Sequence, residues 1–246
     1  MSMICRSTNL KSDYCISERL HDEFCHMMKE ALPEPNTMTT GFYNMKKQIV
    51  ELRLLGMRVS TVVHGQVLNN TYPPSASVFT DASKPFMAGI LQQLSSTRTP
   101  LFINVYPYFA YASNPVQIRL DYAQFTATGP PVVTDRTFIN MFEAMVDRFI
   151  WAIEKIYITN VPVLVSETGW PHAGNGNLTT PEFARIYNKN LMHYILTTKG
   201  TPKRKGSIVG GFIFALIGEN RKPEGVEQIF GVFKPSFDPN YDLFTY

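Results

Sequence analysis

The sequence has no cysteine after residue 25, so the main body of the chain does not depend on disulfide bonds. Its three cysteines, Cys5, Cys15 and Cys25, are spaced neither as a Cys-x-x-Cys pair nor as a zinc ligand set. No apolar run reaches the roughly 18 residues that a membrane-spanning helix requires. The first residues also lack the basic start and uninterrupted apolar stretch of a secretion signal. The sequence therefore predicts no membrane segment, shows no signal peptide and leaves the location of the protein unknown.

Strong charge of one sign is also absent, because the formal net charge is only +3 over 246 residues. The basic run at 203–205 is more typical of a solvated loop than of a nucleic-acid patch. There is no glycine-rich phosphate loop and no G-x-S-x-G nucleophile elbow. His64 and His172 follow predicted strands, but no second ligand stands at metal-binding spacing from either. We expect no nucleic-acid partner, no metal and no cofactor.

Alternating helical and extended patterns organise most of the chain. Residues 1–40 are mixed polar sequence and are predicted to form an irregular N-terminal leader, with one domain over 41–246. In that domain, apolar residues at helical spacing alternate with short apolar runs, which is typical of βα units that feed a parallel sheet. Thr180 and Pro181 are expected to cap and open a helix. Helices are expected over 45–55, 85–94, 138–153 and 181–194, and strands over 58–63, 101–106, 161–166 and 211–216.

This alternation predicts an α/β fold of about four βα units. Four strands with their intervening helices take up residues 58–220, and eight such units would exceed the length of the chain. The pattern therefore matches the C-terminal half of a (β/α)8 TIM barrel. Active sites of that fold are built at the carboxyl ends of the strands, so polar residues there are the first candidates for function.

Glu167 is the first of these strand-end candidates. It follows an apolar strand and precedes a Gly-Trp-Pro turn, so its carboxylate should emerge beside the aromatic ring of Trp170, as a nucleophile is held against a sugar. Glu219 occupies a similar place, with Lys222 three residues later, and Glu227 follows. Ion pairs with no catalytic role explain all three acidic residues equally well on spacing alone.

Aromatic residues after the second and third strands suit stacking on the apolar faces of sugar rings. For Tyr106 and Trp170 we favour a cleft position. For Tyr108 and Phe109 we expect packing in the core.

The segment Val163-Leu164-Val165-Ser166-Glu167-Thr168-Gly169-Trp170-Pro171 resembles the signature of plant endo-β-1,3-glucanases, glycoside hydrolase family 17. The similarity continues in order and spacing from about residue 42 to the C-terminus. Further matching segments are 59–62, 72–76, 104–109, 187–191, 200–204, 214–222 and 230–233.

The resemblance implies a (β/α)8 barrel that hydrolyses β-1,3-glucan with retention, needs no cofactor and is extracellular or bound to the cell wall. It implies two carboxylates about 5 Å apart, one acting as nucleophile and the other as general acid. Glu167 takes the nucleophile position. The substrate-binding positions implied around it are Asn104, Tyr106, Trp170, Glu219, Lys222 and Glu227.

The sequence departs from the family pattern at the general acid. In the family this residue lies on a Val-Gly-Asn-Glu motif that ends the fourth strand, and the tetrapeptide does not occur here. Glu23, Glu30 and Glu34 lack a preceding apolar strand that could present a carboxylate. We therefore expect the general acid to be missing. A non-catalytic β-glucan-binding or remnant protein, and a β-1,3-1,4-glucanase, remain alternatives.

Overall fold

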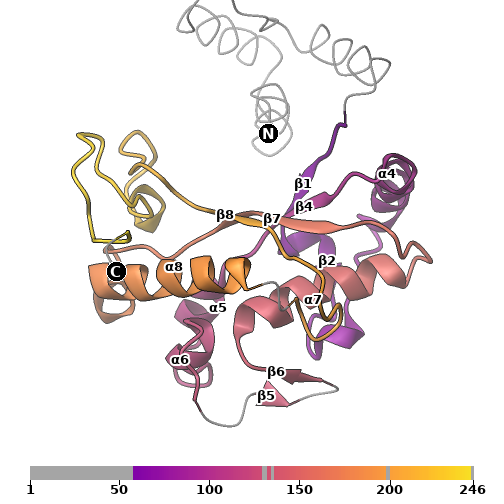
Figure 1. Cartoon of the computed structure of the whole chain (residues 1–246), viewed down its shortest axis with the longest axis horizontal. Coiled ribbons are helices and arrows are strands. Elements are labelled where there is room, and N and C mark those ends of the chain that lie inside the picture. Colours follow the sequence, from indigo (N-terminus) through magenta and orange to yellow (C-terminus); the bar gives the residue numbers. More distant parts are fainter. Residues whose placement is uncertain (1–57, 129–131, 134–135, 198–199, 245–246) are drawn as a thin grey trace, which may run out of the picture. The chain divides into compact units, whose positions relative to one another are not determined.

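The computed structural model describes residues 58–128, 132–133, 136–197 and 200–244 (Figure 1). The chain divides into two compact units, Met1–Thr61 and Val62–Tyr246, and every helix and strand described below belongs to the second. The predicted leader, its boundary near residue 40 and the helix expected over 45–55 lie outside the described residues.

The second unit is a mixed α/β structure built on one four-stranded sheet. Its strands are β1 (Val62–Val63), β4 (Leu101–Asn104), β7 (Val163–Thr168) and β8 (Gly211–Ile213). They are all parallel and lie in chain order, β1-β4-β7-β8. The four predicted strands are therefore confirmed as neighbours in a parallel sheet. Most are shorter than predicted, and the strand expected over 58–63 is reduced to two residues.

Helices connect the strands of this sheet, as expected for βα units. They are α4 (Lys84–Thr97) before β4, α7 (Met141–Glu154) before β7 and α8 (Pro181–Leu196) before β8. The cap predicted for α8 is confirmed, because the Thr180 side chain accepts a hydrogen bond from the Phe183 amide and Pro181 is the first helical residue. Helix α7 begins three residues later than predicted, because Phe138 pairs in a strand and Asn140 caps the helix.

Shorter elements fill the connections. Two antiparallel pairs, β2 with β3 and β5 with β6, pack against α7, and two short helices follow β4. The bounds are β2 Leu68–Asn69, β3 Val78–Phe79, β5 Val132–Val133, β6 Thr137–Phe138, α5 Pro107–Ser113 and α6 Leu120–Ala123, with 3-10 turns η1 Gly65–Val67, η2 Pro74–Ala76, η3 Gly176–Leu178 and η4 Val226–Gln228.

The core lies between the sheet and helices α7 and α8, which run along one face of it (Figure 1). Alternate strand residues face these helices, because successive side chains of a strand point to opposite faces. Leu101 and Ile103 of β4 and Val165 of β7 are completely buried there. The helices contribute apolar side chains at helical spacing, among them Phe142, Val146, Phe149, Ile153 and Leu191.

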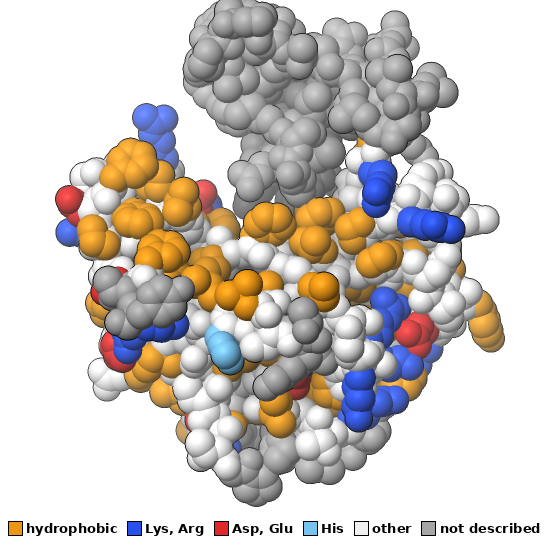
Figure 2. Space-filling model, viewed as in Figure 1, with side chains coloured by type: hydrophobic (Ala, Val, Ile, Leu, Met, Phe, Trp, Pro, Cys, Tyr) orange, Lys and Arg blue, Asp and Glu red, His pale blue; other side chains and the backbone are white. Residues whose placement is uncertain are grey.

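The opposite face of the sheet is less buried over the described residues. Phe102 and Leu164, which alternate with the core residues, are half-buried and lie side by side in the strand register. Figure 2 shows hydrophobic side chains gathered across the part of the surface where β7 and β8 run. Phe212 of β8 is 57% exposed and Leu216, just beyond it, is 63% exposed. Within the described residues, no helix combines the length and hydropathy that crossing a bilayer would need.

Candidate active site

Three polar side chains converge where β4 and β7 end. Asn104, the last residue of β4, donates from Nδ2 to Oε2 of Glu167 at 2.9 Å. Tyr106, two residues further along, donates from its hydroxyl to the same oxygen at 3.1 Å. Within the described part of the chain, the second oxygen of the carboxylate, Oε1, accepts no hydrogen bond. Glu167, which was predicted from its place at a strand end, therefore lies beside two residues that were expected to contact substrate.

An irregularity in β7 creates this arrangement. Ile103 of β4 aligns with Val165, but the next residue, Asn104, aligns with Glu167, so Ser166 is an extra residue in the ladder. In a regular strand Ser166 and Glu167 would point to opposite faces. The bulge at Ser166 changes the phase of the strand, and both side chains now reach Asn104. Bulges commonly re-aim side chains beside active sites.

The environment of Tyr106 keeps its phenol protonated. Burial raises the pKa of this hydroxyl far above its usual range, and the negative charge of Glu167 and the hydrogen bond to it add to the effect. Glu227 raises the pKa of Tyr106 in the same direction, which places its charge near this site. Tyr106 therefore serves as a hydrogen-bond donor to Glu167 rather than as a base.

Aromatic rings surround the Tyr106 side chain. Its ring makes edge contacts with Phe109, Phe214 and Phe230 at centroid distances of 5.4, 6.1 and 5.7 Å. Phe109 was expected in the core, but it is 41% exposed. Tyr108 is buried, as predicted. An open aromatic surface beside a carboxylate is suited to the apolar face of a sugar ring.

Trp170 does not lie at an open surface, so the cleft position that we favoured for it is wrong. Its side chain is completely buried among the rings of Tyr108, Tyr111 and Tyr187. The indole Nε1 donates to the backbone oxygen of Leu178 at 3.0 Å, so the one polar atom of the ring is satisfied in the interior. Trp170 therefore packs against these tyrosine rings in the interior.

The three charged candidates after β8 lie together. Lys222 Nζ is 2.7 Å from Glu219 Oε2 and 3.6 Å from Glu227 Oε2, and it also lies 4.9 Å from the centre of the Phe214 ring. Phe214 in turn contacts Tyr106, so the charged cluster adjoins the aromatic surface. All three charged side chains are between a third and about half exposed. Phe214, Phe230 and Ser166 also belong to this region, and they were not among the site residues predicted from the sequence.

The loop that carries this cluster is closed at its base by backbone contacts. Ala215 pairs with Phe230 and Val232, and the Glu219 amide donates to the Gln228 oxygen at 3.1 Å. Gly231 packs directly against this base, because a Cβ there would lie 2.1 Å from the Gly218 nitrogen.

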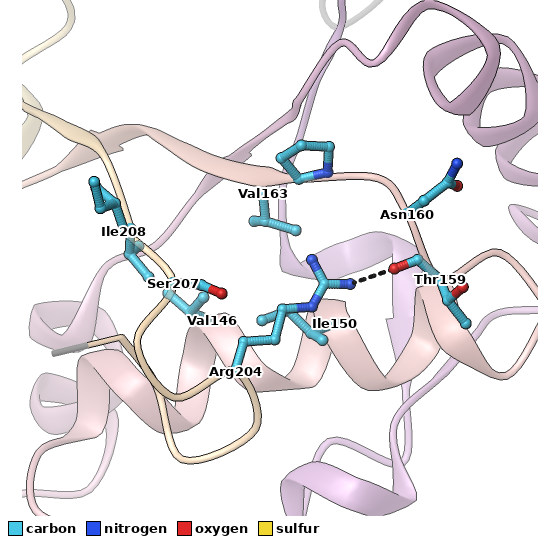
Figure 3. A pocket seen from close by; sticks show the side chains of 10 residues that line it. Val146, Ile150, Thr159, Asn160, Val163, Arg204, Ser207 and Ile208 are labelled. Atoms are coloured by element: carbon cyan, nitrogen blue, oxygen red, sulfur yellow. Dashed lines mark hydrogen bonds between the residues drawn. The ribbon is translucent and has the colours of Figure 1, made fainter. Parts of the chain in front are cut away.

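A separate pocket of about 330 Å³ lies at the opposite end of β7, beside Val163 (Figure 3). The Arg204 side chain extends across it and donates to the backbone oxygens of Val161 at 2.9 Å and Thr159 at 3.4 Å. Arg204 also pairs with Glu154. These contacts hold the 200–209 segment beside α7, away from Glu167. Among the described residues, no group of three or more histidine, cysteine or acidic side chains is placed to hold a metal ion.

Residues 31–244 match the family described as Glycosyl hydrolases family 17. The chain belongs to this family. It is 50% identical over 199 residues to the probable glucan endo-1,3-beta-glucosidase BG4 of Arabidopsis thaliana, a match that covers 80% of this chain and 57% of that protein. It is 39% identical over 202 residues to Lichenase-2 of Hordeum vulgare, covering 81% of this chain and 63% of that protein.

The fold also matches the solved structure of a relative. CJP38, a beta-1,3-glucanase and pollen allergen of Cryptomeria japonica, superposes with a TM-score of 0.75 and is 40% identical over 81% of this chain and 63% of that one. The family 17 chain thus spans a little more than half the length of the curated relatives it matches.

Proposed function

We propose that this family 17 chain carries the nucleophile half of a retaining β-1,3-glucanase site, with Glu167 as the nucleophile. The observation that carries the proposal is the convergence of Asn104 and Tyr106 on one oxygen of Glu167. This contact orients the carboxylate and leaves Oε1 free to attack. The adjoining aromatic surface and the charged cluster of Glu219, Lys222 and Glu227 provide groups that can hold a glucan chain.

The proposed chemistry begins with attack on the sugar. Glu167 Oε1 forms a bond to the anomeric carbon while the bond from that carbon to the glycosidic oxygen breaks, and the electron pair leaves with that oxygen. Water then hydrolyses the glycosyl ester and regenerates the carboxylate. Asn104 and Tyr106 hold Oε2 throughout, which limits the orientations of the reacting group.

We further propose that the general acid is not supplied by this chain. The family tetrapeptide that carries it is absent from the sequence, and Glu219 and Glu227 both pair with Lys222. Loss of a positioned acid typically costs about 10²–10⁴-fold in rate for a leaving group that requires a proton. A dinitrophenyl glycoside does not require one, because dinitrophenolate leaves unprotonated.

The test compares two substrates on the purified full chain. We expect release of dinitrophenolate from dinitrophenyl β-laminaribioside, and little or no release of reducing sugar from laminarin. Glu167→Ala should abolish the first activity, and added azide should restore it with α-laminaribiosyl azide as the product, because azide occupies the space of the removed carboxylate. Glu182→Ala, which removes an exposed carboxylate of α8, is the matched control.

Three outcomes would contradict parts of this proposal. Dinitrophenolate release that persists in Glu167→Ala without azide would exclude Glu167 as nucleophile. Laminarin hydrolysis at a rate similar to that of the aryl glycoside would show that the chain has its own acid. Binding of laminarin without release from either substrate would favour the non-catalytic β-glucan-binding protein.

A mixed-linkage β-1,3-1,4-glucanase is the second candidate, and the similarity to Lichenase-2 favours it. Both activities use the same nucleophile, so they differ only in the linkage they accept. Laminarin and a mixed-linkage β-1,3-1,4-glucan distinguish the two when any residual release of reducing sugar is compared at equal sugar concentration, because only the second polymer contains β-1,4 bonds.

A further inference from the structure

We propose that Ser166 is a positioning residue for the nucleophile and acts through Asn104. This role rests on the proposed role of Glu167, and Ser166 is not among the site residues predicted from the sequence. Ser166 Oγ lies 2.6 Å from Asn104 Oδ1 and 3.2 Å from the backbone oxygen of Ile103. Neither of these contacts of its hydroxyl is with the Glu167 carboxylate, so its influence on the nucleophile passes through Asn104.

The hydrogen-bond pattern determines how the Asn104 amide is oriented. A carboxylate only accepts hydrogen bonds, so the NH2 group of Asn104 must face Glu167 Oε2. Oδ1 then faces the other way and requires a donor. The Ser166 hydroxyl supplies it, since both of its neighbours, Asn104 Oδ1 and Ile103 O, are acceptors. The result is a directed chain from Ser166 through Asn104 to Glu167.

The bulge in β7 explains why Ser166 can take this role. Because Asn104 aligns with Glu167 and Ser166 is the extra residue, the hydroxyl and the carboxylate approach the same amide. Both Ser166 and Asn104 are only partly exposed, so water competes weakly for their polar atoms. Hydrogen bonds in such a chain polarise one another, and the donor at Oδ1 strengthens donation from Nδ2.

The kinetic test uses a reaction that Glu167 performs without a general acid. Dinitrophenyl fluoro-laminaribioside should label Glu167 covalently in the full chain. A bond forms between Glu167 Oε1 and the anomeric carbon, while the bond from that carbon to the aryl oxygen breaks and dinitrophenolate leaves with the electron pair. Intact-mass spectrometry follows the ester. Ser166→Ala should lower the labelling rate constant about 10-fold, the effect of roughly one hydrogen bond. The concentration for half-maximal labelling should be unchanged, because Ser166 does not contact the sugar.

Two comparisons separate positioning from a general structural effect. In an Asn104→Ala background, Ser166→Ala should have no further effect on the labelling rate, since the intermediary is already lost. Ser166→Thr, which keeps the hydroxyl, should recover most of the rate. Ser77→Ala, a completely buried serine whose Oγ makes no hydrogen bond within the described structure, is the matched control and should label at the wild-type rate.

Unchanged labelling in Ser166→Ala, or an equal loss in the Asn104→Ala background, would overturn the positioning role. Wild-type protein that is not labelled at Glu167 would instead refute the proposed nucleophile. A crystal structure of Ser166→Ala decides the positioning role even then. The proposal expects the Asn104 Nδ2 contact to Glu167 to be lost or lengthened, and a contact that stays at 2.9 Å would overturn it.

Discussion

Glu143 provides a pH-dependent test of how the interior is built. This residue lies in the first turn of α7 and is 4% exposed. Its Oε2 has no hydrogen-bond partner within the described structure. The pKa of Glu143 is raised from 4.5 to about 7, chiefly by burial and also by the charge of the nearby Asp147, while hydrogen bonds from Ile139, Tyr194 and Asn140 act in the opposite direction.

The sign of the effect follows from proton binding. Between about pH 4.5 and pH 7 the folded protein keeps a proton on Glu143 that the unfolded chain has released. The free energy of unfolding contributed by this group therefore falls as the pH rises through that window, and is constant above it. A pKa rise from 4.5 to about 7 corresponds to on the order of 3 kcal/mol.

The perturbation is Glu143→Gln, which keeps the shape of the side chain and removes its titration. Thermal unfolding of both proteins should be followed from pH 4 to pH 8. We expect similar midpoints near pH 4 and a variant that is more stable by on the order of 3 kcal/mol at pH 8, or roughly 6–12 °C for a domain of this size. Asp147, whose pKa burial raises to about 6, stays in both proteins, so the effect of its own burial is present in both profiles.

Glu182→Gln is the control for this experiment, because Glu182 is exposed and its pKa is lowered by the hydrogen bond from Arg185. It should not gain stability with rising pH. Parallel pH profiles for wild type and Glu143→Gln would refute the reasoning, since they would show that Glu143 ionises in the folded state as it does in the unfolded chain.

Three further substitutions test the packing around the site. Trp170→Ala should lower the free energy of unfolding by about 3–5 kcal/mol in urea titrations, because the whole indole is buried; a loss below about 1 kcal/mol would contradict the core position. Gly169→Ala should lower the free energy of unfolding by about 1–3 kcal/mol, because its Cβ would lie 2.0 Å from the Phe214 oxygen. Gly89→Ala, where nothing lies within 4 Å of the Cβ, is the control in the same titration. Thr180→Ala should cost about 1 kcal/mol through loss of the α8 cap, with Thr180→Ser retaining most of the stability.

The sequence predicted the order and type of the main elements because their patterns are local. The apolar runs at 101–106 and 161–166 gave β4 and β7, and the Thr-Pro pair at 180–181 placed the start of α8. The strand ends were less predictable. Neither the reduction of β1 to Val62–Val63 nor the bulge at Ser166 leaves a mark in the hydrophobic pattern, because both depend on pairing with a neighbouring strand.

The candidate site was predicted in composition but not in detail. Strand-end logic and the family motif selected Glu167, Asn104 and Tyr106, and the structure brings these three together. Trp170 was misplaced, because a tryptophan after a strand can face either solvent or the core and the motif does not distinguish the two. Its hydrogen bond to the Leu178 oxygen, which allows full burial, is a tertiary contact that spacing alone could not show.

The closed base of the 218–231 loop has a consequence for engineering this scaffold. Backbone pairing of Ala215 with Phe230 and Val232 fixes the two ends of the loop. The close contact of Gly231 with Gly218 leaves no room for a side chain at position 231. The residues between these two glycines, including Lys222 and Glu227, can therefore be transplanted from one relative to another as a cassette. Chimaeras cut at the two glycines would exchange the charge pattern of this loop without redesigning the sheet.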